Sequence, residues 1–249
     1  MRNWLDPVRN ALDSSPEPVT FFFRDDDGGW SDDRLFKLLD LFAAYDLPVD
    51  LAIIPQALTT ALARRICERI EVNRERIGVH QHGFAHVNHE TEGRKCEFGP
   101  ARGRELQEHD IAFGKRILAE LFGPILQPIF TPPWNRCTRQ TGDCLTRLGF
   151  RILSRDSSAA PLNISGLSEL PVRIDWFAKR KGVRLNANEV GVMIADAVRD
   201  AKPVGVMFHH ALMDADERRS AGELLALVAA HNRAQSRLMQ SLPLVVSQS

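Results

Sequence analysis

The sequence lacks the features that mark membrane, exported and nucleic-acid-binding proteins. No apolar stretch reaches the roughly 18 residues of a membrane-spanning helix, and residues 1–10 contain no apolar segment typical of a signal peptide. Lysine and arginine balance aspartate and glutamate at 32 each, so no net charge favours nucleic acid or an anionic membrane as a partner. We therefore expect a soluble, cytoplasmic protein; the sequence makes no prediction of its oligomeric state.

Cysteine is also scarce. The sequence contains four cysteines, Cys67, Cys96, Cys137 and Cys144. Their spacing matches neither a C-x-x-C pair nor a zinc ribbon. A disulfide framework needs an oxidising compartment, which the apparent lack of a signal peptide argues against. We expect free thiols, most of them buried.

What the sequence does contain is a regular alternation of short apolar runs and longer segments of helical period. Strands are predicted at 19–23, 49–54, 77–80, 128–130, 151–154, 172–174 and 204–208. Helices are predicted at 35–45, 60–70, 105–121, 141–148, 190–201 and 221–233. About seven β/α units without a linker or an internal repeat favour a single domain over 1–249, and a barrel over a doubly wound sheet.

Three consecutive carboxylates, Asp25, Asp26 and Asp27, follow the first predicted strand. In a parallel β/α fold the ends of the strands share one face, and active sites are built there. Adjacent carboxylates repel one another, and a bound metal would offset that repulsion. The simpler alternative is a solvated turn in which aspartate caps the next helix.

Two histidines, His82 and His86, lie four residues apart at the end of the third predicted strand. On a helical turn this spacing would place both rings on one side, close enough to share a metal. Together with a strand-end carboxylate they predict a hydrolase centre with three protein ligands, which suits Zn²⁺, Fe²⁺, Co²⁺ or Ni²⁺. His80, beside the pair, is either a core histidine or a residue that supports the ligands.

Two further segments end predicted strands. The run 132–136 reads P-P-W-N-R. It either simply ends a strand or presents an indole on which the apolar face of a sugar can pack. His209 and His210 end the last predicted strand; one would serve as a general acid or base, and at least one would cap or pack.

Together these segments resemble the polysaccharide deacetylases, that is, carbohydrate esterase family 4 or the NodB-homology domain. Residues 24–28 are similar to its T-F-D-D-G motif, and 82–86 to H-[ST]-x-x-H with glycine at the hydroxyl position. Residues 131–135 are similar to R-x-P-[YFW]-G, with Thr131 in place of the arginine. Asp175-Trp176 looks like the fourth motif and the strand ending at His209 like the fifth, so the resemblance covers about 19–215 in the family's order.

The resemblance implies a distorted (β/α)7 barrel and a metal-dependent hydrolase that removes an acetyl group, N-acetyl favoured over O-acetyl, from a carbohydrate or glycoconjugate. Zinc is the expected metal. Asp26 would be the catalytic base and His209 the acid, with Asp27, His82 and His86 as the metal ligands. Substrate contacts would come from Pro133, Trp134, Asn135 and Trp176.

A supporting set of residues completes the implied site: Arg24, Asp25, His80, Arg136, Asp175 and His210. Either Arg24 or Arg136 would replace the arginine of the third motif. Two alternatives remain open from the residues alone: a metal-dependent amidohydrolase acting on a small non-sugar amide, and a non-catalytic relative that has kept the pocket. If the protein acts inside the cell, its substrate would be a short oligosaccharide, a lipid-linked precursor or a small metabolite.

Overall fold

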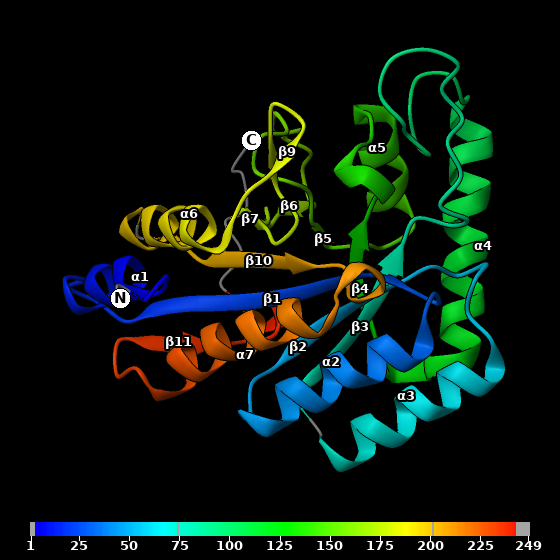
Figure 1. Cartoon of the computed structure of the whole chain (residues 1–249). Coiled ribbons are helices and arrows are strands. Elements are labelled where there is room, and N and C mark those ends of the chain that lie inside the picture. Colours follow the sequence, from blue (N-terminus) through cyan, green and yellow to red (C-terminus); the bar gives the residue numbers. More distant parts are fainter. Residues whose placement is uncertain (1–2, 74, 201, 243–249) are drawn as a thin grey trace.

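A curled parallel sheet forms the centre of the protein in a computed structural model that describes residues 3–242 except 74 and 201 (Figure 1). Its strands follow the order β6-β5-β4-β3-β2-β1-β10-β7, and β11 pairs with the first half of β1. The long strands are β1 (Val19–Gly28), β2 (Val49–Ile53), β3 (Ile77–His82), β4 (Leu126–Thr131) and β10 (Val204–Phe208). The short ones are β5 (Ile152–Leu153), β6 (Ser168–Glu169), β7 (Ile174–Asp175) and β11 (Ala234–Ser236). A separate antiparallel hairpin joins β8 (Lys179–Arg180) and β9 (Val183–Arg184).

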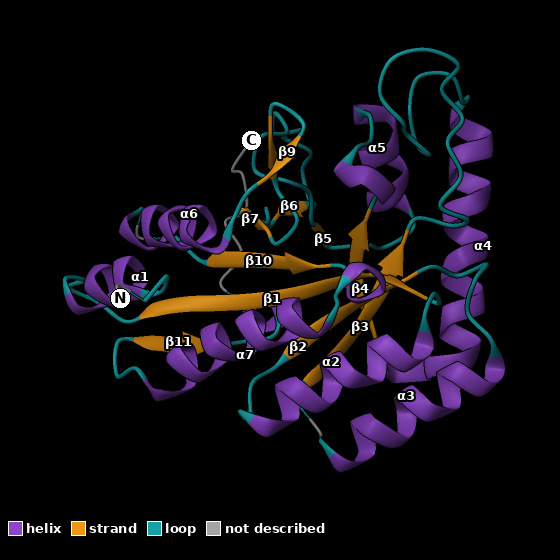
Figure 2. Ribbon diagram, viewed as in Figure 1, coloured by secondary structure: helices purple, strands orange, loops and turns teal. Residues whose placement is uncertain are grey.

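Helices cover the outside of this sheet; in Figure 2, α1 and α6 lie on the opposite side of β1 from α2 and α3. The α-helices are α1 (Asp6–Asp13), α2 (Asp32–Ala44), α3 (Thr60–Val72), α4 (Arg104–Phe122), α5 (Arg139–Arg147), α6 (Ala187–Arg199) and α7 (Ala215–Ala230). Short 3-10 turns are η1 (Gly123–Ile125), η2 (Pro133–Asn135), η3 (His210–Leu212) and η4 (Met239–Ser241). Among the described residues, every helix is too short or too polar to cross a bilayer.

The alternation of side chains along β1 separates the core from the site. Phe21 and Phe23 pack in the main core beneath the helices, whereas Phe22 lies in a second cluster inside the curled sheet. Side chains two residues apart on a strand share a face. Arg24 and Asp26 therefore lie on the same inward face as Phe22. Polar side chains thus line the interior near the carboxyl end of β1.

The expected distorted (β/α)7 barrel is confirmed, with differences at the ends of elements. The predicted strand 19–23 extends to Gly28, because Arg24 and Asp25 pair with both β2 and β10, so the acids lie within the strand and not after it. The predicted strand 172–174 is displaced to Ile174–Asp175. The prediction missed α1, β6, the β8–β9 hairpin and β11. The helix predicted to end at residue 201 ends at Arg199, and residue 201 lies outside the described residues.

All four cysteines are free thiols, as predicted. Cys96 and Cys144 are buried, while Cys67 and Cys137 are only partly so.

Candidate metal centre

Asp27, His82 and His86 converge at the carboxyl ends of β1 and β3. Asp27 Oδ1 lies 3.2 Å from Nε2 of each histidine, and one potential ligand atom from each residue lies within 4.8 Å of the others. The β1–β2 register shifts between Asp25 and Gly28, and Asp27 has a φ of 66°. Such a bulge re-aims a side chain. It lets two successive residues, Asp26 and Asp27, both face the interior.

The donor set fits a divalent transition metal. Asp27 Oδ1 is buried and has no aligned hydrogen-bond donor among the described residues. His82 Nδ1 lies 3.1 Å from the Thr131 carbonyl oxygen; donation there leaves the Nε2 lone pair facing the cluster. Burial would raise the pKa of Asp27, but the contacts with His82 and His86 outweigh it and hold that pKa well below its usual range. An ionised carboxylate and two ring nitrogens facing one point are ligands for Zn²⁺ and similar ions.

The segment between the two histidines is an irregular loop, not the helical turn that the spacing suggested. Gly83 and His86 both have left-handed backbone, with φ of 55° and 56°. Their rings nevertheless lie 5.3 Å apart between centroids. Tertiary contacts, and not helical period, bring the two rings together.

Arg24, and not Arg136, lies beside Asp26. The fully buried Arg24 donates from Nε and Nη2 to the two oxygens of Asp26, at 2.7 and 2.9 Å. Burial would raise the pKa of Asp26, but the charges of Arg24, His82 and His209 together outweigh it and hold that pKa below its usual value, with Arg24 contributing most. Arg136 is only partly buried and donates to the Lys95 carbonyl oxygen at 3.0 Å. Of the two candidate arginines, Arg24 is therefore the one that pairs with Asp26.

Further contacts fix the Arg24 guanidinium. Nη1 donates to Ser154 Oγ at 2.7 Å, and Nη2 donates to Asn135 Oδ1 at 2.8 Å. Asn135 thus connects the P-P-W-N-R segment to the arginine, in addition to any contact with a substrate.

Thr131 joins two histidines of β3. Its carbonyl oxygen faces His82 Nδ1, and its hydroxyl lies 2.9 Å from His80 Nε2. Burial, followed by the Arg24 charge, lowers the pKa of His80 to about 3. His80 is therefore neutral and supports the ligand strand instead of titrating near neutral pH.

His209 lies at the mouth of the interior, beside the candidate base and ligand. It is half-buried, its charge lowers the pKa of both Asp26 and Asp27, and its Nδ1 is buried with no hydrogen-bond partner in the described part of the chain. Burial raises the pKa of nearby Asp175, whose Oδ1 accepts the Phe177 amide at 2.8 Å.

His210 has a different environment. It is fully buried, its Nδ1 lies 2.6 Å from Asp25 Oδ2, and its Nε2 lies 2.6 Å from the Trp30 carbonyl oxygen. The third acid of the cluster is therefore paired within the fold and faces away from the metal ligands.

Trp176 is a correction to the expected substrate contacts. It is buried in the main core, with Trp4 and Phe208 at 6.1 and 5.1 Å between centroids, and its Nε1 donates to Glu217 at 2.6 Å. Trp176 follows β7 and joins the main core with Ile174, two residues before it, whereas Asp175 between them lies near His209.

Two indoles flank His86. Its ring lies 4.5 Å from the Trp134 centroid and 4.8 Å from that of Trp30, which is 41% exposed. Pro133 is buried beneath this rim, and Trp134 and Asn135 have left-handed backbone with φ of 55° and 58°. Sequence reasoning missed Trp30, although its position three residues after the acids was a usable signal. It also missed Glu97, a buried residue that bonds to the ligand loop.

The comparisons with known proteins connect this geometry to one fold. No family model matches the sequence, and no curated protein matches it. A proposed polysaccharide deacetylase from Mycobacterium smegmatis superposes with a TM-score of 0.66 at 16% identity, over 95% of this chain and 96% of its own. A family 4 acetyl xylan esterase from Clostridium thermocellum, solved with a cobalt ion, gives 0.56 at 11% identity, over 88% and 87%.

A third neighbour is a family 4 pseudoenzyme from Bacillus anthracis, with a TM-score of 0.61 at 8% identity, over 91% of this chain and 66% of that one. At these identities the likeness establishes the fold alone. The chain has the fold of the polysaccharide deacetylases.

Proposed function

We propose that this chain, whose fold is that of the polysaccharide deacetylases, belongs to that family and is a metal-dependent hydrolase that removes acetyl groups, N-acetyl favoured, from a carbohydrate. One observation carries the proposal. Asp27, His82 and His86 converge beside a buried, arginine-paired Asp26 at the carboxyl face of the barrel. We take residues 1–249 as a single catalytic domain.

Asp27, His82 and His86 would hold the metal, with Zn²⁺ favoured and Fe²⁺, Co²⁺ or Ni²⁺ compatible with the same donors. When bound, such an ion supplies Lewis acidity that polarises an acyl carbonyl and lowers the pKa of a water ligand towards about 7.

Asp26 accepts a proton from the attacking water. Its pKa is held low by Arg24, so it is ionised at neutral pH and able to act as a base. The bidentate contact also fixes the plane of the carboxylate, which limits the rotation that would turn its oxygens away from the water.

His209 donates a proton to the leaving amine. It directly follows β10 and lies close to Asp26 and Asp175. An imidazole is the side chain that most often serves as a general acid in such a position.

Trp134 and Trp30 present the surface on which the sugar packs. Both indoles contact His86, and an indole face suits the apolar face of a pyranose. Asn135 holds Arg24 in place and lies within the same rim.

The test is acetate release by protein loaded with Zn²⁺ or Co²⁺. The substrates are N-acetylated oligosaccharides, acetylated xylan and small acetylated amines, each assayed with and without a chelator, with Asp26→Asn as the inactive control. Chelator-sensitive release from an oligosaccharide supports the proposal. Release only from small amines would replace it with an amidohydrolase, and no release from any substrate by metal-loaded protein would support a non-catalytic relative.

A further inference from the structure

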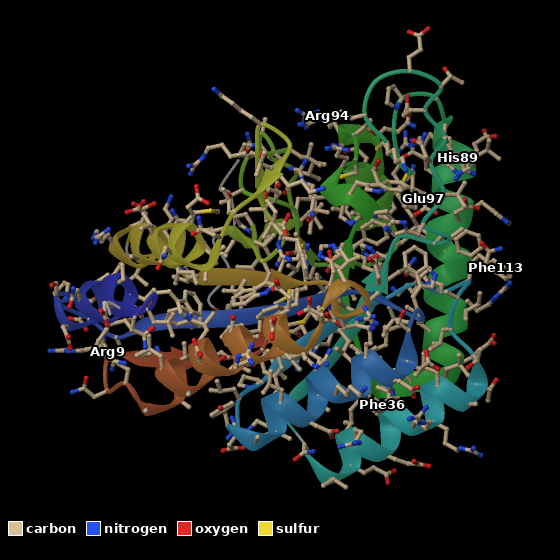
Figure 3. All side chains as sticks on the ribbon, in the orientation of Figure 1. Arg9, Phe36, His89, Arg94, Glu97 and Phe113 are labelled. Atoms are coloured by element: carbon tan, nitrogen blue, oxygen red, sulfur yellow. The ribbon has the colours of Figure 1, made fainter. Side chains whose placement is uncertain are left out.

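After the ligand loop, residues 87–103 form the rest of the connection from β3 to α4. We call these residues the strap; they lie beside α4 and α5 (Figure 1). Figure 3 labels His89, Arg94 and Glu97 on this strap. Most of its middle is exposed, but Cys96, Glu97 and Phe98 are buried, and Glu97 has no exposed surface. No described cation lies within ion-pair distance of the Glu97 carboxylate, so hydrogen-bond donors must satisfy it.

The donors are two amides of the metal-ligand loop. Ala85 N donates to Glu97 Oε1 at 2.7 Å, and Phe84 N donates to Oε2 at 3.2 Å. Both amides lie between His82 and His86 and directly precede His86. One carboxylate therefore fixes two consecutive peptide groups, with charge-assisted bonds that are stronger than neutral ones.

The rest of this loop is fixed from other directions. Gly83 N donates to the Thr131 carbonyl at 2.9 Å, and Gln81 Nε2 donates to the Gly83 carbonyl at 2.8 Å. These contacts hold the part of the loop next to His82. The amides of Phe84 and Ala85, next to His86, are held by Glu97 of the strap.

Gly83 fits closely against the same carboxylate. A Cβ built there would lie 2.2 Å from Glu97 Oε2 and 2.5 Å from Pro133 Cδ, and its φ is +55°. Glycine meets both conditions. In the motif that residues 82–86 resemble, a serine or threonine stands at this position. A side chain there would collide with the Glu97 carboxylate, so glycine and the buried glutamate fit together.

The strap is itself joined to the segment that carries Trp134. Phe98 pairs with Cys137 in an isolated parallel bridge, and Thr138 N donates to the Phe98 carbonyl at 3.2 Å. Cys96 Sγ contacts the Arg136 carbonyl oxygen at 3.4 Å. The residues on both sides of Glu97 are thus anchored, so its carboxylate has a fixed place.

We propose that Glu97 is a positioning residue of the metal centre, whose carboxylate sets the loop conformation that presents His86 to the ion. The inference rests on the proposed function only for the existence of that metal site. Groups that orient metal ligands commonly change metal affinity by about 10- to 100-fold when replaced.

The experiment compares Glu97→Gln with Glu92→Gln, the same change at an exposed position on the same strap. Zn²⁺ and Co²⁺ affinities are measured by competition with a chromophoric chelator, and the visible spectrum of the Co²⁺ form reports the geometry of the ligands. We expect Glu97→Gln to weaken metal binding by about 10- to 100-fold and to alter the Co²⁺ bands. We expect Glu92→Gln to match the wild type in both.

Thermal melting of the metal-free proteins verifies that each variant folds. If Glu97→Gln does not fold, Glu97→Asp keeps the charge but withdraws the oxygens by one methylene, and the same weakening is expected. Wild-type affinity and an unchanged Co²⁺ spectrum in a folded Glu97 variant would overturn this inference alone. A wild-type protein that binds no metal would overturn both this inference and the proposed function.

Discussion

At the scale of single residues, Asp26 and Asp27 have different partners, and the different roles proposed for them rest on this. Asp26 faces a guanidinium that satisfies both of its oxygens, whereas Asp27 faces two ring nitrogens. The first arrangement stabilises an ionised base, and the second leaves a carboxylate oxygen for an ion. Two adjacent carboxylates can therefore be proposed for two different tasks.

The first prediction concerns the base. Asp26→Asn keeps the size of the side chain but cannot accept a proton at neutral pH, so we expect kcat to fall by about 10²- to 10⁴-fold with metal binding unchanged. Steady-state kinetics and metal analysis of the same preparation measure the two quantities. Loss of the metal with the activity would show that Asp26 is a ligand and not the base.

The second prediction concerns Arg24. Lysine keeps the charge but not the bidentate contact, so Arg24→Lys should raise the pKa of Asp26 towards its ordinary value. The base is active when ionised, above its pKa. The acid limb of the pH profile of kcat/KM should therefore move to higher pH. Arg136→Lys is the matched control, because within the described part of the chain the Arg136 guanidinium bonds to a carbonyl oxygen of the strap and not to Asp26. An equal shift in both variants would contradict the role given to Arg24.

Several site residues could be predicted from the sequence and others could not. Spacing near strand ends was enough to bring the acids 25–27 together with His82 and His86, because parallel strands bring their carboxyl ends to one face. The family resemblance was needed to choose Asp27 among the three acids. Choosing between Arg24 and Arg136 required knowing which side chain shares the inward face of β1 with Asp26. Glu97 belongs to the short run E-F-G, but sequence reasoning assigned it no role, since its partners are backbone amides on another segment.

At the scale of elements, the Asp25–His210 pair holds β1 against the end of β10. The imidazole also reaches the Trp30 carbonyl, so one buried ring connects both strands to the turn before α2. The Asp25 charge and hydrogen bond outweigh the effect of burial and raise the pKa of His210 to about 9.

This raised pKa gives a prediction for stability. The folded protein holds the proton more tightly than an unfolded chain with a pKa near 6.5, so the contribution is complete below pH 6.5 and is lost as pH rises through about 9. At about 1.4 kcal/mol per pKa unit, it is on the order of 3 kcal/mol. Urea denaturation of metal-free protein from pH 6 to 9.5 should show this loss in the wild type and not in His210→Gln. If the free energy of unfolding changed with pH equally in the wild type and in His210→Gln, the stabilising role of the Asp25–His210 pair would be contradicted.

The elements missed from the sequence share a physical character. The strands β6, β8, β9 and β11 are two or three residues long, too short for a period of two to be visible. The start of α7 was missed although Asp214 accepts the Glu217 amide at 2.9 Å, a cap that the D-x-x-E spacing could have indicated. In α1, Pro7 near the first position and the apolar residues Val8, Ala11 and Leu12 were comparable signals.

At the scale of the whole molecule, residues 234–242 close the end of the barrel opposite the candidate metal centre. Strand β11 pairs with β1, and Met239 and Leu242 then join Phe22 in the interior cluster. Met239 N donates to Asp50 at 2.9 Å, and burial raises the pKa of that carboxyl to about 7. The face that carries the candidate metal centre and the closed end thus border the same interior.

We therefore expect Met239→Ala to lower the free energy of unfolding by about 2–5 kcal/mol, because it opens a cavity inside the sheet. Metal affinity should be unchanged, since Met239 lies at the other end of the interior. Gln240→Ala, at the exposed neighbouring position, is the control. Chemical denaturation and a metal titration measure the two effects, and equal stability of the two variants would show that the segment does not contribute to the core.

The barrel itself was predictable because its signal is distributed along the whole chain. Alternating apolar strands and helical periods fix a parallel β/α architecture even when individual boundaries are wrong by a few residues. The substitution of arginine by Thr131 in the third motif looked like a loss. In the structure the arginine beside Asp26 is Arg24 from β1, and its guanidinium also reaches Asn135, which follows β4, although two strands separate β1 from β4 in the sheet. Only the curled sheet brings these residues together.

The central claim is that Asp27, His82 and His86 form a metal site. The most direct test loads wild-type protein, Asp27→Ala and His82→Ala with Zn²⁺, removes excess ion, and measures metal per chain by elemental analysis. The account predicts near one ion per chain in the wild type and loss of it in both variants. A wild-type protein that retains no metal under any loading condition would contradict it.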